Sequence, residues 1–380
     1  MVEWKKLGDI CEIKGRIGFR GYTREDQVDK GEGAISLSPG NITDGSLNFD
    51  SCTYITWEKY DESPEIMVSE GDIILGKTAS VGKVARIKEL PEKATINPQL
   101  VLIKNITINP QYLFYVLSDS PFQKTIKGLA GVGSVPNVSQ AKLSQILIPV
   151  PNPSEQERIE KLLNTFTSSI DNLKQQIAQR RKQYEYYRDQ LLDLEGKEGV
   201  EKRVLKEVCE VINGRAYSQP ELLDKGKYRV LRVGNFFSND SWYYSDLELE
   251  DKYYCNKGDL LYAWSASFGP HIWEEEKVIY HYHIWKMNCK EALDTKYMYY
   301  WLQSEDMKKQ AFSNLHGATM AHLTKVLMES LKVPVPPLSE QQRIVDILDK
   351  FEASIQNLEA QLSQREKQYE YYRNKLLTFE

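Results

Sequence analysis

The 380-residue sequence lacks long apolar runs and is poor in cysteine, and each absence argues against a class of protein. No stretch approaches the roughly 20 consecutive apolar residues of a membrane-spanning helix, so we expect no membrane partner. The first residues, MVEWKKLGDI, contain no apolar segment of the kind found in secretory signal peptides. The five cysteines form no CxxC pair, which indicates neither a disulfide framework nor a structural zinc site. These features predict a cytoplasmic protein.

Catalytic motifs are also lacking. The sequence contains no DPPY or NPPY motif of an adenine methyltransferase and no FxGxG loop for a methyl donor. The five histidines all lie in the second half, and the pair His281-x-His283 has no cysteine or carboxylate cluster to complete a metal site. Alternation along a strand is the simpler interpretation of that pair. We therefore expect no catalytic residue, no metal and no cofactor in this chain.

What the sequence does contain is a tandem repeat. Residues 148–192 align without a gap with residues 333–377, and 26 of the 45 pairs are identical. The N-terminal parts of the two halves are related only faintly, through a Leu…Cys-Glu…Gly-Arg segment at 7–16 and 205–215. Each half is therefore a divergent globular region followed by a closely matched segment. The two globular regions are expected to share a fold but not a surface.

The matched segment has the spacing of a coiled-coil helix. It starts with Ser-Glu-Gln, which suits a helix N-terminus, and apolar residues then recur at intervals of four and three for more than four heptads. A single helix packed on its own domain is the alternative, but two matched seams favour pairing with each other. The predicted seam residues are Leu163, Phe166, Ile170, Leu173, Ile177, Tyr184, Leu191, Leu348, Phe351, Ile355, Leu358, Leu362, Tyr369 and Leu376.

The short linker between the halves predicts that the two helices are antiparallel. A helix of about 40 residues is roughly 60 Å long. The linker Gly196–Lys202 reaches at most about 25 Å, so it cannot return the chain to the start of the first helix. We therefore predict two globular domains at opposite ends of a rod. The predicted boundaries are 1–152 and 197–337 for the domains, and 153–196 and 338–380 for the helices.

The globular regions are predicted to be α+β. Short aliphatic runs such as Asp72–Leu75, Leu100–Ile103 and Leu260–Tyr262 are separated by Gly, Asn, Asp and Pro, as strands are. A stretch with helical periodicity follows in each half, at Pro110–Ser118 and at Thr295–Gln303. The whole chain is thus expected to be a pseudo-two-fold repeat of an α+β domain and a long helix.

One stretch imitates a nucleotide-binding loop. Residues Gly71–Thr78 read GDIILGKT and match the pattern GxxxxGK[ST]. In a phosphate-binding loop the strand precedes the first glycine, whereas here the residues between the glycines have the composition of a strand. The aligned residues Gly258–Trp264 lack the second glycine and the lysine. We favour a structural interpretation, and an ATP-using enzyme is the alternative.

The order of these elements resembles the specificity (S) subunits of type I restriction–modification systems. Each half begins with the L-x-x-[IV]-C-E-[IV]…G-R segment, continues with a G-D-[IL]-[IL] strand and ends in PVP and SEQ-x-RI before the long helix. The resemblance spans the whole chain. It implies two target-recognition domains, each reading one half of a bipartite DNA site through the major groove, with the coiled coil fixing the spacer between them.

The resemblance also implies partners and their cofactors. Two methyltransferase (M) subunits would dock on the pseudo-two-fold body and supply S-adenosylmethionine and adenine methylation. Restriction (R) subunits, with ATP and Mg, would join that core. Two dissimilar domains imply two different half-sites and therefore an asymmetric target. A coiled-coil scaffold whose globular domains bind protein instead of DNA is the alternative function.

Any DNA-binding face must be local, because the net charge of the chain is −5. Candidate contacts follow strand ends and glycine-rich segments at matching places in the two halves. Arg suits guanine and Asn or Gln suits adenine, whereas Lys, Ser and Thr more often hold phosphates. A solvated surface position is the alternative for each. The candidates are Arg16, Arg20, Arg24, Lys77, Thr78, Ser80, Lys83, Asn137, Gln140, Arg215, Trp264, Ser265, Ser267, His322 and Lys325.

Overall fold

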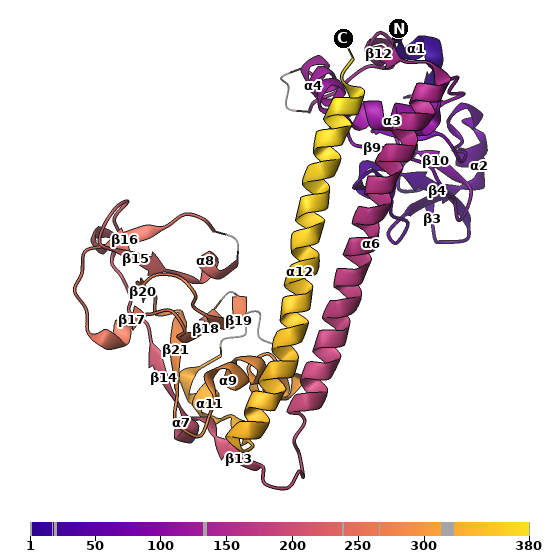
Figure 1. Cartoon of the computed structure of the whole chain (residues 1–380). Coiled ribbons are helices and arrows are strands. Elements are labelled where there is room, and N and C mark those ends of the chain that lie inside the picture. The colour runs from indigo at the N-terminus through magenta and orange to yellow at the C-terminus, as the bar shows by residue number, and fades with distance from the viewer. Residues whose placement is uncertain are drawn as a thin grey trace. The chain divides into compact units, whose positions relative to one another are not determined.

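The computed structural model describes residues 2–16, 18, 21–131, 135–237, 239–265, 267–312 and 323–379. Its contacts divide the chain into two compact units, which are Met1–Asn172 with Gln361–Glu380, and Leu173–Ala360. Each unit contains one globular region of strands and short helices together with a part of each of two long helices (Figure 1). Within the described residues, none of the helices is long and apolar enough to cross a membrane.

The globular region of the first unit is built on two four-stranded sheets. The first sheet is antiparallel and has the order β2-β11-β8-β9, with strands Glu12–Lys14, Leu100–Lys104, Ile73–Gly76 and Val84–Arg86. The second has the order β10-β4-β7-β3, with strands Ala94–Ile96, Gly33–Leu37, Thr53–Thr56 and Gln27–Val28, and β10 runs parallel to β4. Two further antiparallel pairs are β1 (Glu3–Lys6) with β12 (Leu147–Val150), and β5 (Ile42–Thr43) with β6 (Ser46–Leu47).

Alternating side chains of β8 divide this region into layers. Ile73 and Leu75 belong to a core shared with the helices, whereas Ile74 belongs to a core shared with the second sheet. Successive side chains of a strand point to opposite faces, so β8 is buried on both sides. The first sheet therefore lies between a helical layer and the second sheet. The helical layer contains α1 (Leu7–Ile10), α3 (Pro110–Ser118), α4 (Ser120–Leu129) and α5 (Gln140–Ser144), whereas α2 (Trp57–Asp61) contacts β4 and β7 of the second sheet.

The globular region of the second unit repeats this plan. Its antiparallel sheet has the order β14-β21-β18-β19, with strands Cys209–Asn213, Ile284–Cys289, Leu260–Ser265 and Ser267–Ile272. Its mixed sheet has the order β16-β15-β20-β17, with strands Tyr243–Ser245, Tyr228–Leu231, Val278–Tyr280 and Tyr254–Cys255. β13 (Glu201–Val204) pairs with β22 (Lys332–Val335). The helices are α7 (Leu205–Val208), α8 (Val233–Phe237), α9 (Thr295–Trp301), α10 (Glu305–Phe312) and α11 (Lys325–Ser330).

The mixed sheets of the two units share three strands and differ at their edges. In both units a central strand, β4 or β15, has a parallel neighbour on one side and an antiparallel neighbour on the other. The fourth strand is added at a different edge in each unit. β3 pairs with β7, the antiparallel neighbour of the central strand, whereas β17 pairs with β20, the parallel neighbour. The predicted α+β tandem repeat is thus confirmed, and the divergence of the two globular regions has a structural counterpart.

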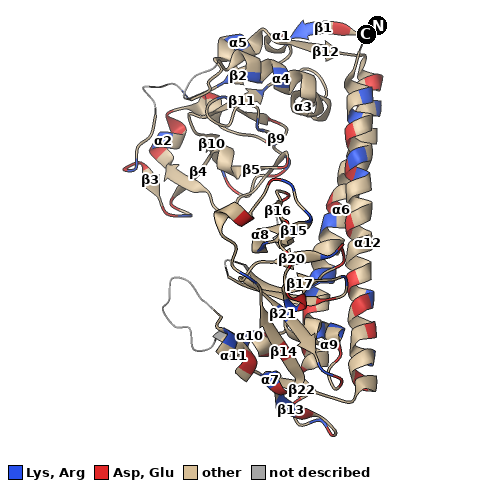
Figure 2. Ribbon diagram, turned by 90° about the vertical axis from the view of Figure 1, so that its left-hand side faces the viewer, with Lys and Arg blue, Asp and Glu red and all other residues tan. Residues whose placement is uncertain are grey.

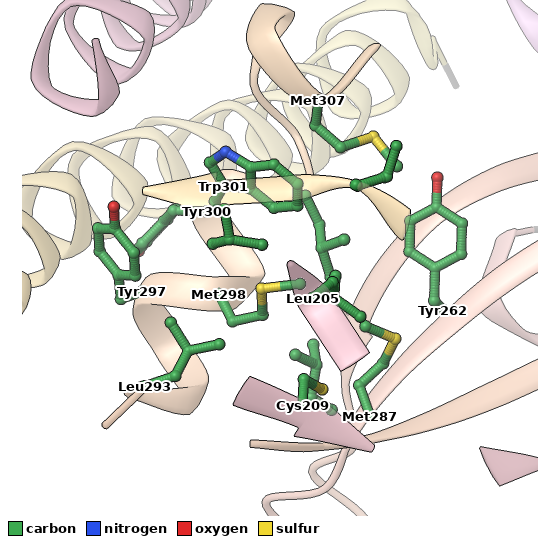
Figure 3. Packing of buried hydrophobic residues seen from close by; sticks show 14 of the residues in the cluster. Leu205, Cys209, Tyr262, Met287, Leu293, Tyr297, Met298, Tyr300, Trp301 and Met307 are labelled. Atoms are coloured by element: carbon green, nitrogen blue, oxygen red, sulfur yellow. The ribbon is translucent and has the colours of Figure 1, made fainter. Parts of the chain in front are cut away.

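The main core of the second unit is rich in aromatic and sulfur-containing side chains. Figure 3 shows Met298 and Trp301 of α9, Leu205 of α7, Cys209 of β14 and Met287 of β21 in this cluster. All five are at most 2% exposed. Complete burial of one large apolar side chain contributes roughly 1.5–3 kcal/mol, so this contact between helices and sheet is a major source of stability.

In both units a buried glutamine connects the globular region to its long helix, and we call this contact the joint. In the first unit the buried Gln156 donates from Nε2 to the Pro151 carbonyl at 2.7 Å and accepts the Asn109 N–H at 2.9 Å. Gln341 makes the equivalent pair of bonds in the second unit, each 2.8 Å long. The joint explains why the PVP and SEQ motifs recur: the proline carbonyls need a buried donor, and the glutamine amide supplies it.

The long helices are α6 (Pro153–Leu192) and α12 (Leu338–Leu377), each of 40 residues. In the first unit the Phe166 ring of α6 stacks on Tyr372 of α12, with centroids 5.3 Å apart. In the second unit Tyr187 of α6 stacks on Phe351 of α12 at 5.5 Å. The beginning of each helix thus lies beside the end of the other, which confirms the antiparallel pairing within each unit.

All of the predicted seam residues are buried or partly buried. Those that are buried are Leu163, Ile170, Leu173, Ile177, Tyr184 and Leu348. Those that are partly buried are Phe166, Leu191, Phe351, Ile355, Leu358, Leu362, Tyr369 and Leu376. The opposite placement of the two domains and their exact boundaries stay predictions.

Candidate nucleic-acid interface

Three segments that are distant in sequence meet at one edge of the first unit. The segment after β8 places the Lys77 N–H 2.9 Å from the carbonyl oxygen of Gln99, in the turn between β10 and β11. Thr78 forms a β-bridge with Asn137, and its hydroxyl donates to the Asn137 Oδ1 at 2.8 Å. The structure therefore brings together two predicted contact regions, 77–83 and Asn137, with a turn that was not predicted.

The segment that matches the nucleotide-binding pattern contains the strand β8 and the start of the turn after it. Residues 73–76 form β8, and after a turn the chain runs back as β9, so the strand–loop–helix order of a phosphate-binding loop does not occur here. Gly76 is needed for close packing, because a Cβ there would lie 2.3 Å from the Ser80 carbonyl oxygen. Ala79 has a φ of 60°, in the left-handed region. The glycine thus has a structural role.

Arg16 lies inside the domain beside this edge. Its side chain is 4% exposed, and its Nε donates to the Ile96 carbonyl at 3.2 Å while Nη2 donates to the Thr95 hydroxyl at 3.2 Å. Burial lowers the pKa of Arg16, against the opposing effect of Tyr22 and of carboxylates. The guanidinium therefore holds the Gly15-Arg16 segment against β10. It supports the edge formed by Lys77, Gln99 and Asn137 from the interior of the domain.

The other candidates of the first unit have varied surroundings. In the orientation that satisfies both neighbours, the Gln140 amide donates to the Ile13 carbonyl at 3.1 Å and accepts the Gly15 N–H at 3.2 Å. The exposed Lys83 donates to the Pro39 carbonyl at 3.2 Å. Arg24 is exposed, Lys77, Thr78 and Ser80 are partly buried, and Arg20 lies outside the described residues.

In the second unit the matching edge is aromatic. Trp264 follows the buried part of β18, and its indole Nε1 donates to the Tyr282 carbonyl at 2.9 Å. Its ring stacks on Trp285 at 5.6 Å and meets His283 edge-on at 5.1 Å. These contacts hold the turn between β20 and β21, from which the Tyr282 side chain is 39% exposed.

Arg215 occupies the place of Arg16 and is held by a carboxylate. Two of its nitrogens bond to the two oxygens of Glu221, at 3.1 and 2.6 Å. The hydrogen bond from Arg215 is the main reason that the pKa of Glu221 falls to about 2. The Arg215 backbone also bonds to the strand before the turn and to the turn itself: its N–H donates to the Tyr280 carbonyl at 3.1 Å, and its carbonyl accepts the Tyr282 N–H at 3.0 Å.

The remaining candidates of the second unit are only partly described. Ser265 ends β18 and is partly buried, and Ser267 begins β19. Lys325 lies 3.4 Å from Glu329 in a surface ion pair. His322 lies outside the described residues.

The turn between β10 and β11, with its counterpart between β20 and β21, is the feature that the sequence interpretation missed. It comprises Asn97–Gln99 in the first unit and His281–His283 in the second. The sequence signal for this turn is a short polar segment between two apolar strands in each half. Because the two segments share no residue, they could not be aligned by identity. His281 and His283 were interpreted only as alternation along a strand.

Charge is distributed rather than concentrated. Figure 2 shows blue basic and red acidic residues interspersed along both α6 and α12. This agrees with the net charge of −5. Lys77 and Lys83 supply positive charge at the edge of the first unit. A contact with nucleic acid would therefore use a few cations and polar groups rather than a broad basic face.

Comparison with known proteins identifies the repeated fold. The family model described as type I restriction modification DNA specificity domain matches residues 1–180 and again residues 197–366. The chain belongs to this DNA specificity family. The two matches contain the two equivalent edges described above, one in each. They confirm both the tandem repeat and the resemblance that the sequence motifs suggested.

Curated relatives of this DNA specificity protein agree. It is 30% identical over 291 residues to a putative type I restriction enzyme specificity subunit of Haemophilus influenzae, covering 72% of this chain and 73% of the relative. It is 27% identical over 296 residues to the EcoR124I/EcoR124II specificity subunit of Escherichia coli, covering 71% and 70%.

Solved structures support the fold of the DNA specificity protein over its full length. A chain from a study of complex assembly and conformational transition of the type I R-M system matches with a TM-score of 0.63 at 18% identity, covering 99% of this chain and 96% of that chain. The type I restriction–modification S subunit from M. genitalium matches with a TM-score of 0.58 at 16% identity, covering 100% and 97%.

Proposed function

We propose that this chain is the DNA-recognition subunit of a type I restriction–modification complex and that it reads an asymmetric, bipartite site with one globular region for each half-site. The observation that carries the proposal is the pair of equivalent edges. Both globular regions have the fold of the DNA specificity family, and in each the third strand of the antiparallel sheet leads to a residue that bonds to the equivalent turn, Lys77 to Gln99 in the first and Trp264 to His283 in the second. Their side chains differ, with amides and lysines in the first and aromatic rings and histidines in the second. One fold with two surfaces suits two different half-sites.

The chain itself is non-catalytic in this proposal. Two methyltransferase subunits would supply S-adenosylmethionine and the adenine chemistry, and restriction subunits would supply ATP-dependent cleavage with Mg. The nearly identical joints and long helices support equivalent docking of two partners, because each joint makes the same hydrogen bonds. Among the described residues, no group of three or more His, Cys, Asp and Glu side chains could hold a metal. The paired helices would set the spacer between the half-sites.

The proposal is tested by the sequence that the complex methylates. The full chain is produced with the methyltransferase subunit of its own system in cells that lack other adenine methylation, and the genome is sequenced with detection of methylated bases. We expect one motif with two specified blocks separated by unspecified bases. The methyltransferase produced without this chain is the control and should give no motif. Methylation at a single contiguous block, or a motif that does not depend on this chain, would refute the proposal and favour a protein-binding scaffold.

A further inference from the structure

The turns at Asn97–Gln99 and His281–His283 have the same backbone frame. The Asn97 N–H donates to the Leu37 carbonyl at 2.8 Å, and the His281 N–H donates to the Leu231 carbonyl at 2.9 Å. In each turn the carbonyl of the first residue also accepts the N–H three residues later, at 3.2 Å in the first unit and 2.9 Å in the second. The two turns are therefore equivalent positions of the repeat, although their sequences are unrelated.

The same neighbours fix the last residue of each turn. The Gln99 carbonyl accepts the Lys77 N–H at 2.9 Å, and the His283 carbonyl accepts the Trp264 N–H at 3.2 Å. Arg16 and Arg215 lie on the other side and bond to the strand that leads into the turn. Each turn is thus held by bonds to neighbouring segments, including the Arg16 guanidinium in the first unit and the Arg215 backbone in the second. Its side chains can differ between the units without a change in the frame.

In the first unit the turn presents an oriented amide. The Asn97 Oδ1 accepts the Gln99 N–H at 3.0 Å, and the Asn97 Nδ2 donates to the Gln99 Oε1 at 3.2 Å. The bond from Asn97 uses one lone pair of the Gln99 Oε1. The second lone pair of this oxygen and the Nε2 hydrogens of the exposed Gln99 are therefore available for an outside partner. An acceptor and a donor on one amide match the N6 and N7 edge of adenine in the major groove.

In the second unit the turn presents an aromatic ring. The rings of His281 and His283 both contact Tyr282, with centroids 4.4 and 3.9 Å from its own. Trp264 holds the Tyr282 backbone through its indole N–H, at 2.9 Å. The exposed phenol offers a flat apolar face and one hydroxyl, which suit a thymine methyl group or a single base-edge acceptor. Tyr282 cannot make the two-point amide contact of Gln99.

We propose that Gln99 and Tyr282 are equivalent specificity-determining residues, one for each half-site, with Gln99 reading an adenine. The proposal rests on the proposed function and deepens it by naming the base readers. Asn97 positions the amide of Gln99, and Trp264 positions the backbone of Tyr282. The two half-sites differ, in this account, because one frame carries an amide and the other a phenol.

The test uses the complete complex of this chain with its methyltransferase and a library of duplex DNA in which about 20 central base pairs are randomised. Bound duplexes are selected, amplified and sequenced for the natural chain and for Gln99→Ala, Gln99→Glu and Tyr282→Ala. A good two-point contact contributes roughly 5- to 150-fold discrimination. We expect Gln99→Ala to lose about that much preference for adenine at one position of one block. Gln99→Glu should shift the preference there to cytosine, because a carboxylate accepts a hydrogen bond from the N4 amino group of cytosine.

Each variant is the matched control for the other. Tyr282→Ala should relax one position in the other block and leave the block read by Gln99 unchanged. If the natural chain selects two blocks and both Gln99 variants select the same bases with the same preference, the assignment of Gln99 is wrong. A uniform loss of affinity without altered preference would make Gln99 a phosphate contact and also overturn the inference. If the natural chain selects no motif at all, the proposed function fails instead.

Discussion

Replacing Gln341 by alanine should loosen the joint between the second globular region and α12. Gln341 is fully buried; its Oε1 accepts the Asp294 N–H at 2.8 Å, and its Nε2 donates to the carbonyls of Pro336 and Ala292 at 2.8 and 2.9 Å. Truncation removes the partner of three backbone groups in a site closed to water. An unsatisfied buried group costs about 1–3 kcal/mol, and the two carbonyls keep lone pairs for other contacts, so we expect a total loss of about 3 kcal/mol.

Thermal unfolding followed by tryptophan fluorescence measures this loss, because most of the tryptophans lie in the second unit. For a unit of this size, about 3 kcal/mol lowers the Tm by about 6–12 °C. The control is Gln342→Ala, since the side chain of the exposed neighbour Gln342 donates to Asp346 at 2.8 Å on the helix surface and should contribute less than about 0.5 kcal/mol. Equal Tm values for the two variants would refute the role assigned to the joint.

Three further predictions concern other parts of the chain. Adding one heptad to both long helices lengthens each by about 10.5 Å. The methylated motif should then gain about three spacer base pairs and keep its half-site bases. Altered half-site bases would rule out the spacer role. Burial raises the pKa of Glu352 above its ordinary value of 4.5, so its contribution to stability falls as the pH rises from 4.5 through the raised pKa. Glu352→Gln should flatten that part of the denaturation midpoint–pH curve, and an unchanged slope would count against the assignment. We expect no ATP binding by the free chain, and Lys77→Ala should not change this. If the natural chain binds ATP and the variant does not, the result would favour the ATP-using enzyme.

The long helices could be predicted because their signals are local and repeated. The seam depends on spacing within one segment, and both copies show it, from Leu163 in α6 to Leu348 in α12. The antiparallel order followed from linker length alone. A strand was also predicted at Asp72–Leu75, where β8 covers Ile73–Gly76, because an aliphatic run bounded by glycine leaves few alternatives.

The contact residues were harder to predict because burial of a polar side chain depends on distant parts of the chain. Arg16 follows a strand in a glycine-rich segment, and only the return of β10 reveals that its guanidinium bonds to Thr95 and Ile96. Gln140 is likewise used by the backbone at Ile13 and Gly15. The turn at Asn97–Gln99 was missed because its equivalence to His281–His283 depends on bonds to Leu37 and Leu231, which no local pattern predicts.

The aromatic stacks between α6 and α12 have a consequence for shorter chains. Phe166 and Tyr187 of α6 occupy the same repeat positions as Phe351 and Tyr372 of α12. Each stack joins a phenylalanine of one helix to a tyrosine of the other, so each helix alone carries both members of the contact. Such a surface is self-complementary. A polypeptide that ended after α6 could form a symmetric homodimer through the contacts that the full chain makes with itself, and two identical globular regions would then require a palindromic target.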